Sequence, residues 1–71
     1  MKRMEDLIKD PNKGSPLNKY ASEVIAMREN DVPYKDISIW LNDEHGIVVT
    51  HQNIRDWYTR LEAKFKDYEK T

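Results

Sequence analysis

The amino-acid sequence predicts an all-α domain of three helices, of which the last is the longest. Three stretches place apolar residues at spacings of three, four and seven, which is the repeat of a helix buried along one side. Each stretch lies between residues that begin or end helices, such as Ser15, Gly46 and Thr50. The β-branched run at residues 47–49 is too short for a sheet, because no other segment offers a partner strand.

Residues 1–15 are expected to form an N-terminal segment that precedes the main domain. Three apolar residues of this segment share one face at helical spacing: Met4, Leu7 and Ile8. We expect either a short helix within residues 1–10, ended by Pro11, or a frayed terminus. In the first case, the apolar face is expected to pack near the far end of the last helix, close to Phe65 and Tyr68.

The main domain spans residues 16–71, and its first helix is expected to run from Ser15 to about Asn30. Serine caps helices, and the proline that follows suits the first helical position, where its missing N–H is not needed. The helix is expected to end before Pro33, because the residue before a proline avoids helical backbone angles. The buried stripe is expected to contain Leu17, Tyr20, Ala21, Val24 and Ile25.

The second helix is expected over residues 34–44, with Gly46 in the left-handed conformation that ends many helices. Its inward side chains are expected to be Ile37, Trp40 and Leu41. The linker after Gly46 is expected to be extended, with Ile47 and Val49 filling the core between the second and third helices.

The third helix is expected from Thr50, whose hydroxyl can cap a first-turn N–H, to about Tyr68. Its apolar stripe consists of Ile54, Trp57, Tyr58, Leu61, Phe65 and Tyr68. This stripe is longer than a three-helix core of this size needs. We therefore expect Leu61, Phe65 and Tyr68 to be covered either by the N-terminal segment or by a second copy in a homodimer.

Length and composition narrow the classes of function. A chain of 71 residues forms one small domain, for which a partner subunit is a common source of extra stability. The absence of cysteine excludes disulfides and thiolate metal sites, and no residue pattern suggests a metal, a cofactor or a catalytic centre. No apolar run approaches the ~20 residues of a membrane span, and the N-terminus does not resemble a signal peptide, so we expect a cytoplasmic protein.

The charges are distributed unevenly along the chain, although the net charge is only −1. Residues 1–19 carry a net charge of +2, residues 20–50 carry −4, and residues 51–71 carry +1. A negative total counts against a strong nucleic-acid binder. The basic balance at both ends still allows a locally positive DNA-binding face.

Two stretches of the sequence resemble small helix-turn-helix DNA-binding proteins of phage, plasmid and resolvase type. The first, Val32–Leu41, matches a turn, an aromatic residue, two polar residues, isoleucine, a small residue and leucine. The second, Gly46–Trp57, matches a glycine-containing turn and a capped helix with isoleucine in its second turn. Leu41 and Ile54 are farther apart than in the compact motif, which implies a longer second helix or turn. The resemblance implies a transcription regulator, such as a repressor, with its third helix, from Thr50, in the major groove of double-stranded DNA.

In that arrangement the polar face of the third helix contacts base edges. Gln52 can pair with adenine and Arg55 with guanine, and each such pair discriminates between bases by ~1–3 kcal/mol. Thr59 can meet a thymine methyl group or a phosphate. Asp56 can accept a hydrogen bond from cytosine, or it can instead orient Arg60 four residues along the helix.

Phosphate contacts are expected where helices begin. Thr50 and His51 lie where unpaired backbone N–H groups attract a phosphate, and Lys35 lies at the start of the second helix. Two other interpretations remain open. The polar face of the third helix can instead be an ordinary solvated surface. Alternatively, the chain is a protein-interaction adaptor that uses the helix-turn-helix as a scaffold for binding a host protein.

Overall fold

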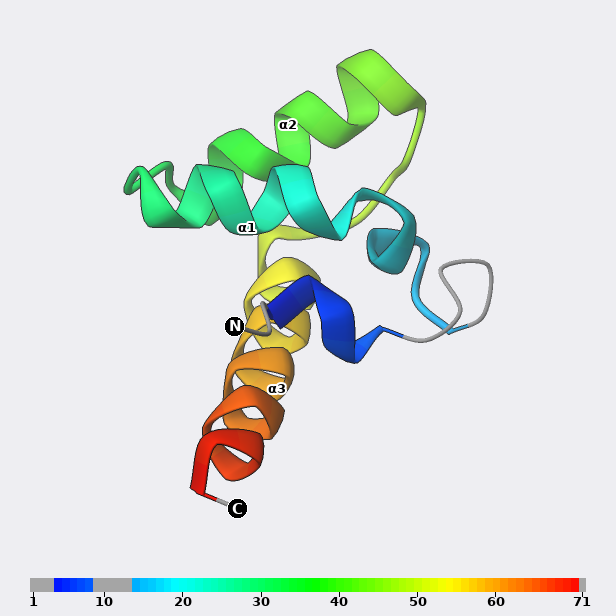
Figure 1. Cartoon of the computed structure of the whole chain (residues 1–71). Coiled ribbons are helices and arrows are strands. Elements are labelled where there is room, and N and C mark those ends of the chain that lie inside the picture. Colours follow the sequence, from blue (N-terminus) through cyan, green and yellow to red (C-terminus); the bar gives the residue numbers. More distant parts are fainter. Residues whose placement is uncertain (1–3, 9–13, 71) are drawn as a thin grey trace.

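The computed structural model describes residues 4–8 and 14–70 and consists of helices and short connections over that part of the chain (Figure 1). The prediction of an all-α domain with three helices is confirmed. Two 3-10 helices precede them. The elements are η1 (Met4–Leu7), η2 (Pro16–Tyr20), α1 (Ala21–Glu29), α2 (Tyr34–His45) and α3 (His51–Lys70).

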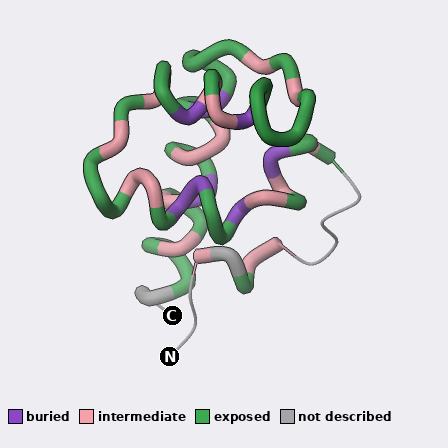
Figure 2. Tube along the Cα trace, turned by 90° about the horizontal axis from the view of Figure 1, so that it is seen from above, coloured by how far each residue is buried: buried purple, intermediate pink, exposed green. Residues whose placement is uncertain are grey.

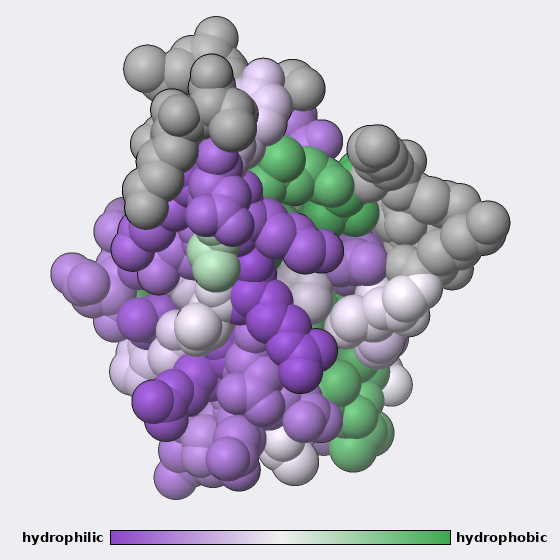
Figure 3. Space-filling model, turned by 90° about the horizontal axis from the view of Figure 1, so that it is seen from below, coloured by the Kyte–Doolittle hydropathy of each residue, from purple (hydrophilic) through white to green (hydrophobic). Residues whose placement is uncertain are grey.

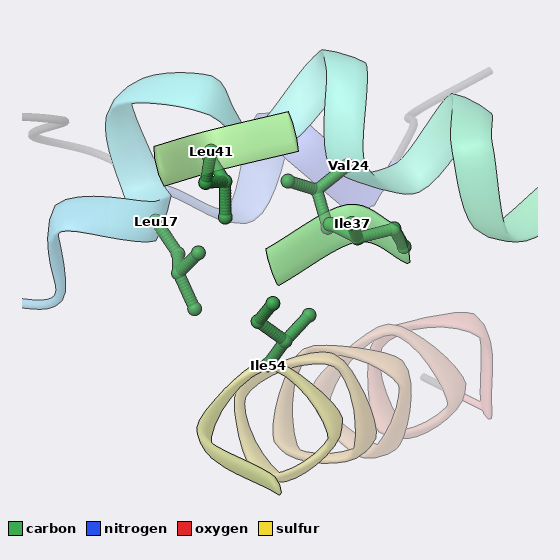
Figure 4. Packing of buried hydrophobic residues seen from close by; sticks show 5 residues of the cluster. All are labelled: Leu17, Val24, Ile37, Leu41 and Ile54. Atoms are coloured by element: carbon green, nitrogen blue, oxygen red, sulfur yellow. The ribbon is translucent and has the colours of Figure 1, made fainter. Parts of the chain in front are cut away.

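Helices α1 and α2 lie side by side and run in opposite directions, and α3 crosses beneath them (Figure 1). Every helix of this arrangement contributes to the main core cluster, which consists of Leu17, Val24, Ile37, Leu41 and Ile54. These side chains point toward one another between the helices (Figure 4). The buried parts of the chain therefore face inward, while the outer turns are exposed (Figure 2).

The first predicted helix begins where the sequence indicates, although its first five residues form the 3-10 helix η2. The Ser15 hydroxyl accepts a hydrogen bond from the Leu17 amide over 3.2 Å, and Pro16 occupies the first helical position. Tighter 3-10 turns are common at helix N-termini, where few backbone bonds have yet formed. The predicted stripe is buried at Leu17 and Val24 and half-buried at Tyr20.

The turn after α1 is closed by Asp31, which adopts the left-handed conformation with φ 62°. The Val32 amide donates to the Met27 carbonyl over 2.9 Å, and the Asp31 amide donates to the Arg28 carbonyl over 3.1 Å. This pair of bonds is a Schellman motif, which is usually built around glycine. Arg28 also donates from Nη1 to the Val32 carbonyl over 2.7 Å, so its side chain holds the same turn from outside.

Helix α2 ends at His45, one residue later than predicted, and Gly46 follows with φ 65° as expected. The Gly46 amide donates to the Asn42 carbonyl over 3.0 Å. In the extended linker, Ile47 and Val49 are half-buried and pack against the main core cluster, as predicted. The intervening Val48 points away from the core and is 86% exposed.

The N-terminal segment packs on a second, smaller cluster that consists of Ala21, Ile25 and Leu61. Met4, Leu7 and Ile8 are half-buried against this cluster. This contact lies at the level of Leu61, about one turn of α3 before Phe65, where Ala21 and Ile25 supply further apolar surface. Within the range expected for a short helix, the described residues form the four-residue 3-10 helix η1; residues 1–3 and 9–13, Pro11 included, lie outside the described part.

Helix α3 is 20 residues long, or about 30 Å at the usual rise per residue. Its apolar stripe is buried at Ile54 and Leu61, half-buried at Phe65 and 46% exposed at Tyr68.

Seen from below, the surface is mainly hydrophilic, and hydrophobic residues gather on one side of the view (Figure 3). Among the described residues, none of the helices combines the length and apolar character that a bilayer crossing requires.

Candidate nucleic-acid interface

The candidate site is built on the N-terminal half of α3, which one buried residue anchors to the rest of the domain. Ile54 is fully buried among the side chains of η2, α1 and α2 (Figure 4). Because a helix presents different residues every 100°, this anchor turns the opposite side of α3 toward solvent. Each residue that the sequence predicted for DNA contact is exposed: Lys35, Thr50, His51, Gln52, Arg55, Asp56, Thr59 and Arg60.

Thr50 caps the helix, as its sequence position predicted. Its hydroxyl accepts from the Asn53 amide over 3.2 Å, and its carbonyl accepts from the Ile54 amide over 3.2 Å. The backbone amides of His51 and Gln52 have no acceptor within the described part of the chain. The start of α3 therefore offers two free N–H donors at the positive end of the helix dipole.

The predicted polar face is divided into two parts. Asp56 and Arg60 line a groove on one flank of α3, whereas Gln52, Arg55 and Thr59 do not. No ion pair joins Asp56 to Arg60 within the residues that the structure describes, so the predicted orienting pair is absent there. The open part of the face consequently presents an amide, a guanidinium and a hydroxyl.

The groove has a volume of about 570 Å³ and lies between α3, the N-terminal segment and η2. Apolar side chains such as Leu17 and Leu61 meet polar and charged ones from α3 along its walls. The indole of Trp57 spans this region, since its Nε1 donates to Asn18 Oδ1 over 2.7 Å. This bond ties η2 to α3 beside the candidate interface.

Sequence reasoning missed three groove residues, Asn18 of η2 and Asn53 and Lys64 of α3. Residues 53, 56, 60 and 64 are separated by three or four positions, which places them on one flank of a helix. This spacing could have been used to predict that these four residues face a different direction from Gln52, Arg55 and Thr59. Nothing local in the sequence indicated that η1 and η2 would form the opposite wall.

Lys35 is exposed at the start of α2, as predicted. The preceding residue, Tyr34, places its ring 6.5 Å from the ring of Tyr58. Tyr58 follows His51 by seven residues, or about 10 Å along the helix. Lys35 and the free N–H groups at the start of α3 are therefore separate sites for negative charge.

Burial raises the pKa of the Tyr58 phenol above its ordinary value of 10.0, and the Glu62 carboxylate and the Tyr34 phenol raise this pKa further. The Arg28 guanidinium opposes the shift by lowering the same pKa. Its centre lies 4.1 Å from the centre of the Tyr34 ring and 6.0 Å from that of Tyr58. Tyr58 is thus a protonated, half-buried support for α3, located beside the candidate interface.

The described part of the chain contains no group of three or more His, Cys, Asp or Glu side chains arranged to hold a metal ion. The exposed side chains of the candidate site carry hydrogen-bonding and charged groups. No protein-family model, curated protein or solved structure matches this chain.

Proposed function

We propose that this chain is a sequence-specific DNA-binding protein that places the N-terminal half of α3 in the major groove of double-stranded DNA. The observation that carries the proposal is the orientation of α3. Ile54 holds one side in the core, and Gln52, Arg55 and Thr59 are exposed on the outer face. The resemblance to phage and plasmid helix-turn-helix proteins supports a cytoplasmic transcription regulator.

The outer face supplies groups that suit base edges. The Gln52 amide can both donate to and accept from adenine, and the Arg55 guanidinium can donate twice to guanine. Thr59 lies about two turns beyond Gln52 and suits a phosphate or a thymine methyl group. Asp56 and Arg60 lie at the edge of this face, where they also line the groove.

The charge around the start of α3 also favours a phosphate backbone. Residues 46–55 contain no aspartate or glutamate, although the chain has 13 acidic residues. The free amides of His51 and Gln52 add two donors, and Lys35 adds an exposed cation in the first turn of α2. Contacts of this kind position a protein on DNA, while the base contacts give specificity.

A homodimer is part of the proposal. Leu61 is covered within one chain, but Phe65 remains half-buried and Tyr68 is 46% exposed near the end of α3. A symmetric contact through these two aromatic residues would cover them and would match a palindromic DNA site. Light scattering over a range of concentrations tests this contact, and a constant mass of 8.5 kDa would exclude it.

The test of DNA binding begins with selection of a preferred site from a random duplex library, followed by fluorescence anisotropy on the selected duplex. Arg55→Ala is expected to weaken binding about tenfold or more and to relax preference at one base pair. Lys66→Ala is the matched control, because it also removes one cation from an exposed position of α3. Absence of a preferred site, or an equal effect of the two substitutions, would exclude the proposed reading face.

A second candidate function is supported by the outer face of α2. Ile39 is 50% exposed there, and Asp36 and Asp43 are exposed on the same helix. An apolar residue flanked by carboxylates suits an adaptor that binds a basic surface of a host protein. Ile39→Asp would then abolish capture of the host protein while leaving any DNA binding unchanged.

A further inference from the structure

We infer that Val48 is a specificity-determining residue that contacts the 5-methyl group of a thymine at the edge of the DNA site. This inference rests on the proposed function, because it assumes that the start of α3 lies in the major groove. Val48 belongs to the linker between α2 and α3. Neither the family resemblance nor the helix pattern assigns a function to this residue.

Val48 is the most exposed of the large hydrophobic residues in the described part of the chain. Its exposed fraction is 86%, compared with 50% for Ile39 and 46% for Tyr68. Its neighbours Ile47 and Val49 are half-buried against the main core cluster. Because successive side chains of an extended segment point to opposite sides, fixing those two residues inward directs Val48 outward.

The chain geometry places Val48 at the start of α3. Two peptide units separate it from the capping residue Thr50, so their Cα atoms lie within about 7.6 Å of each other. The free amides of His51 and Gln52 are at the same end of the helix. In helix-turn-helix docking, this end of the third helix approaches the base edges.

The chemistry of the side chain selects its partner within DNA. Valine has no hydrogen-bonding group, so it cannot bind phosphates or the polar edges of bases. In the major groove the apolar group available on a base is the 5-methyl group of thymine. Residues 46–55 also lack carboxylates, so no negative charge of this segment repels the backbone beside that base.

The test compares thymine with uracil, which lacks only the methyl group. On the selected duplex, each thymine is replaced singly by deoxyuridine, and binding is measured by fluorescence anisotropy. For the wild-type chain, one replacement is expected to weaken binding about fourfold, the amount for removing one buried methyl-sized group. Val48→Ala is expected to weaken binding to the thymine duplex and to bind both duplexes equally.

The controls separate this inference from the proposed function. Ile39→Ala removes a different exposed apolar side chain and is expected to retain the full preference for thymine. If a site is selected and depends on Arg55, but Val48→Ala keeps the preference for thymine, the inference is wrong and the proposed function stands. If Val48→Ala weakens binding equally on the thymine and uracil duplexes, Val48 contacts a sugar or another chain, and the inference is also wrong. If no preferred site can be selected, both proposals fail.

Discussion

The indole Nε1 of Trp57 donates a hydrogen bond to Asn18 Oδ1 over 2.7 Å, although the two residues are 39 positions apart in the sequence. Both side chains are half-buried and line the groove beside the candidate interface. The bond joins η2, at the start of the main domain, to the middle of α3. It therefore helps to set the position of α3 relative to the rest of the chain.

A double-mutant cycle should measure how much this hydrogen bond contributes to the free energy of unfolding. Trp57→Phe and Asn18→Ala are each expected to destabilise the fold, with a coupling free energy of about 1 kcal/mol, because each substitution removes the same bond. Urea denaturation of the single and double variants gives this value. As a control, Asn42→Ala at an exposed position of α2 should be additive with Trp57→Phe. A coupling within ~0.3 kcal/mol of zero would mean that the bond contributes nothing to stability.

Replacing Asp31 with glycine should stabilise the protein. Asp31 has φ 62°, which disfavours a residue with a Cβ atom, and its carboxylate lies at the negative end of α1. Asp31→Gly is expected to raise the free energy of unfolding by about 0.5–1 kcal/mol, as measured by urea denaturation. Asp31→Ala removes the same charge but keeps the Cβ atom, and should be less stable than Asp31→Gly. Equal stability of these two variants would show that the charge, and not the backbone conformation, is responsible.

Arg28 should contribute more to stability than an exposed arginine. It donates to the Val32 carbonyl over 2.7 Å and lies 4.1 Å from the centre of the Tyr34 ring. Its Nε atom is buried without a partner among the described residues, which offsets part of this gain. Arg28→Ala is therefore expected to cost about 2 kcal/mol in thermal or urea denaturation.

The matched control for Arg28 is Arg60→Ala, which truncates an exposed arginine at the edge of the groove. Its effect is expected to stay within about 0.5 kcal/mol, as for most surface substitutions. Similar losses for the two variants would show that the turn after α1 does not depend on the Arg28 side chain.

Tyr58 should make the fold sensitive to alkaline pH. Burial raises the pKa of its phenol in the folded state above the unfolded value of 10.0, so folding favours the neutral phenol. This contribution to stability is complete below the unfolded pKa and is lost as the pH rises through the folded pKa. Stability measured by urea denaturation from neutral to alkaline pH should therefore decline less steeply for Tyr58→Phe than for the wild-type chain. Parallel curves for the two proteins would contradict this assignment.

Much of the local structure could be predicted because its causes are local. Ser15, Thr50 and Gly46 begin or end helices through bonds and backbone angles that involve only nearby residues. The buried residues Ile37, Leu41 and Ile54 follow from the period of an amphipathic helix. The alternation of side chains in an extended segment predicted that Ile47 and Val49 would enter the core, which leaves Val48 exposed.

The candidate site was less predictable, because it depends on which elements meet. The helix pattern of α3 placed Asp56 and Arg60 on one polar face with Gln52 and Arg55. The wall formed by η1 and η2 turns that flank into a groove, and no spacing within α3 contains this information. The packing of η1 at Leu61 also depends on Ala21 and Ile25, which belong to another helix.

By itself, the sequence determined the helical class, the boundaries of the helices to within a few residues, and the side that each helix buries. These features arise from hydrogen bonds and apolar spacing within short segments. Only the tertiary structure decided the pairing of Trp57 with Asn18 and the groove that η1 and η2 form beside Asp56 and Arg60. The physical reason is that each of these depends on how distant apolar surfaces exclude water together, which local spacing does not specify.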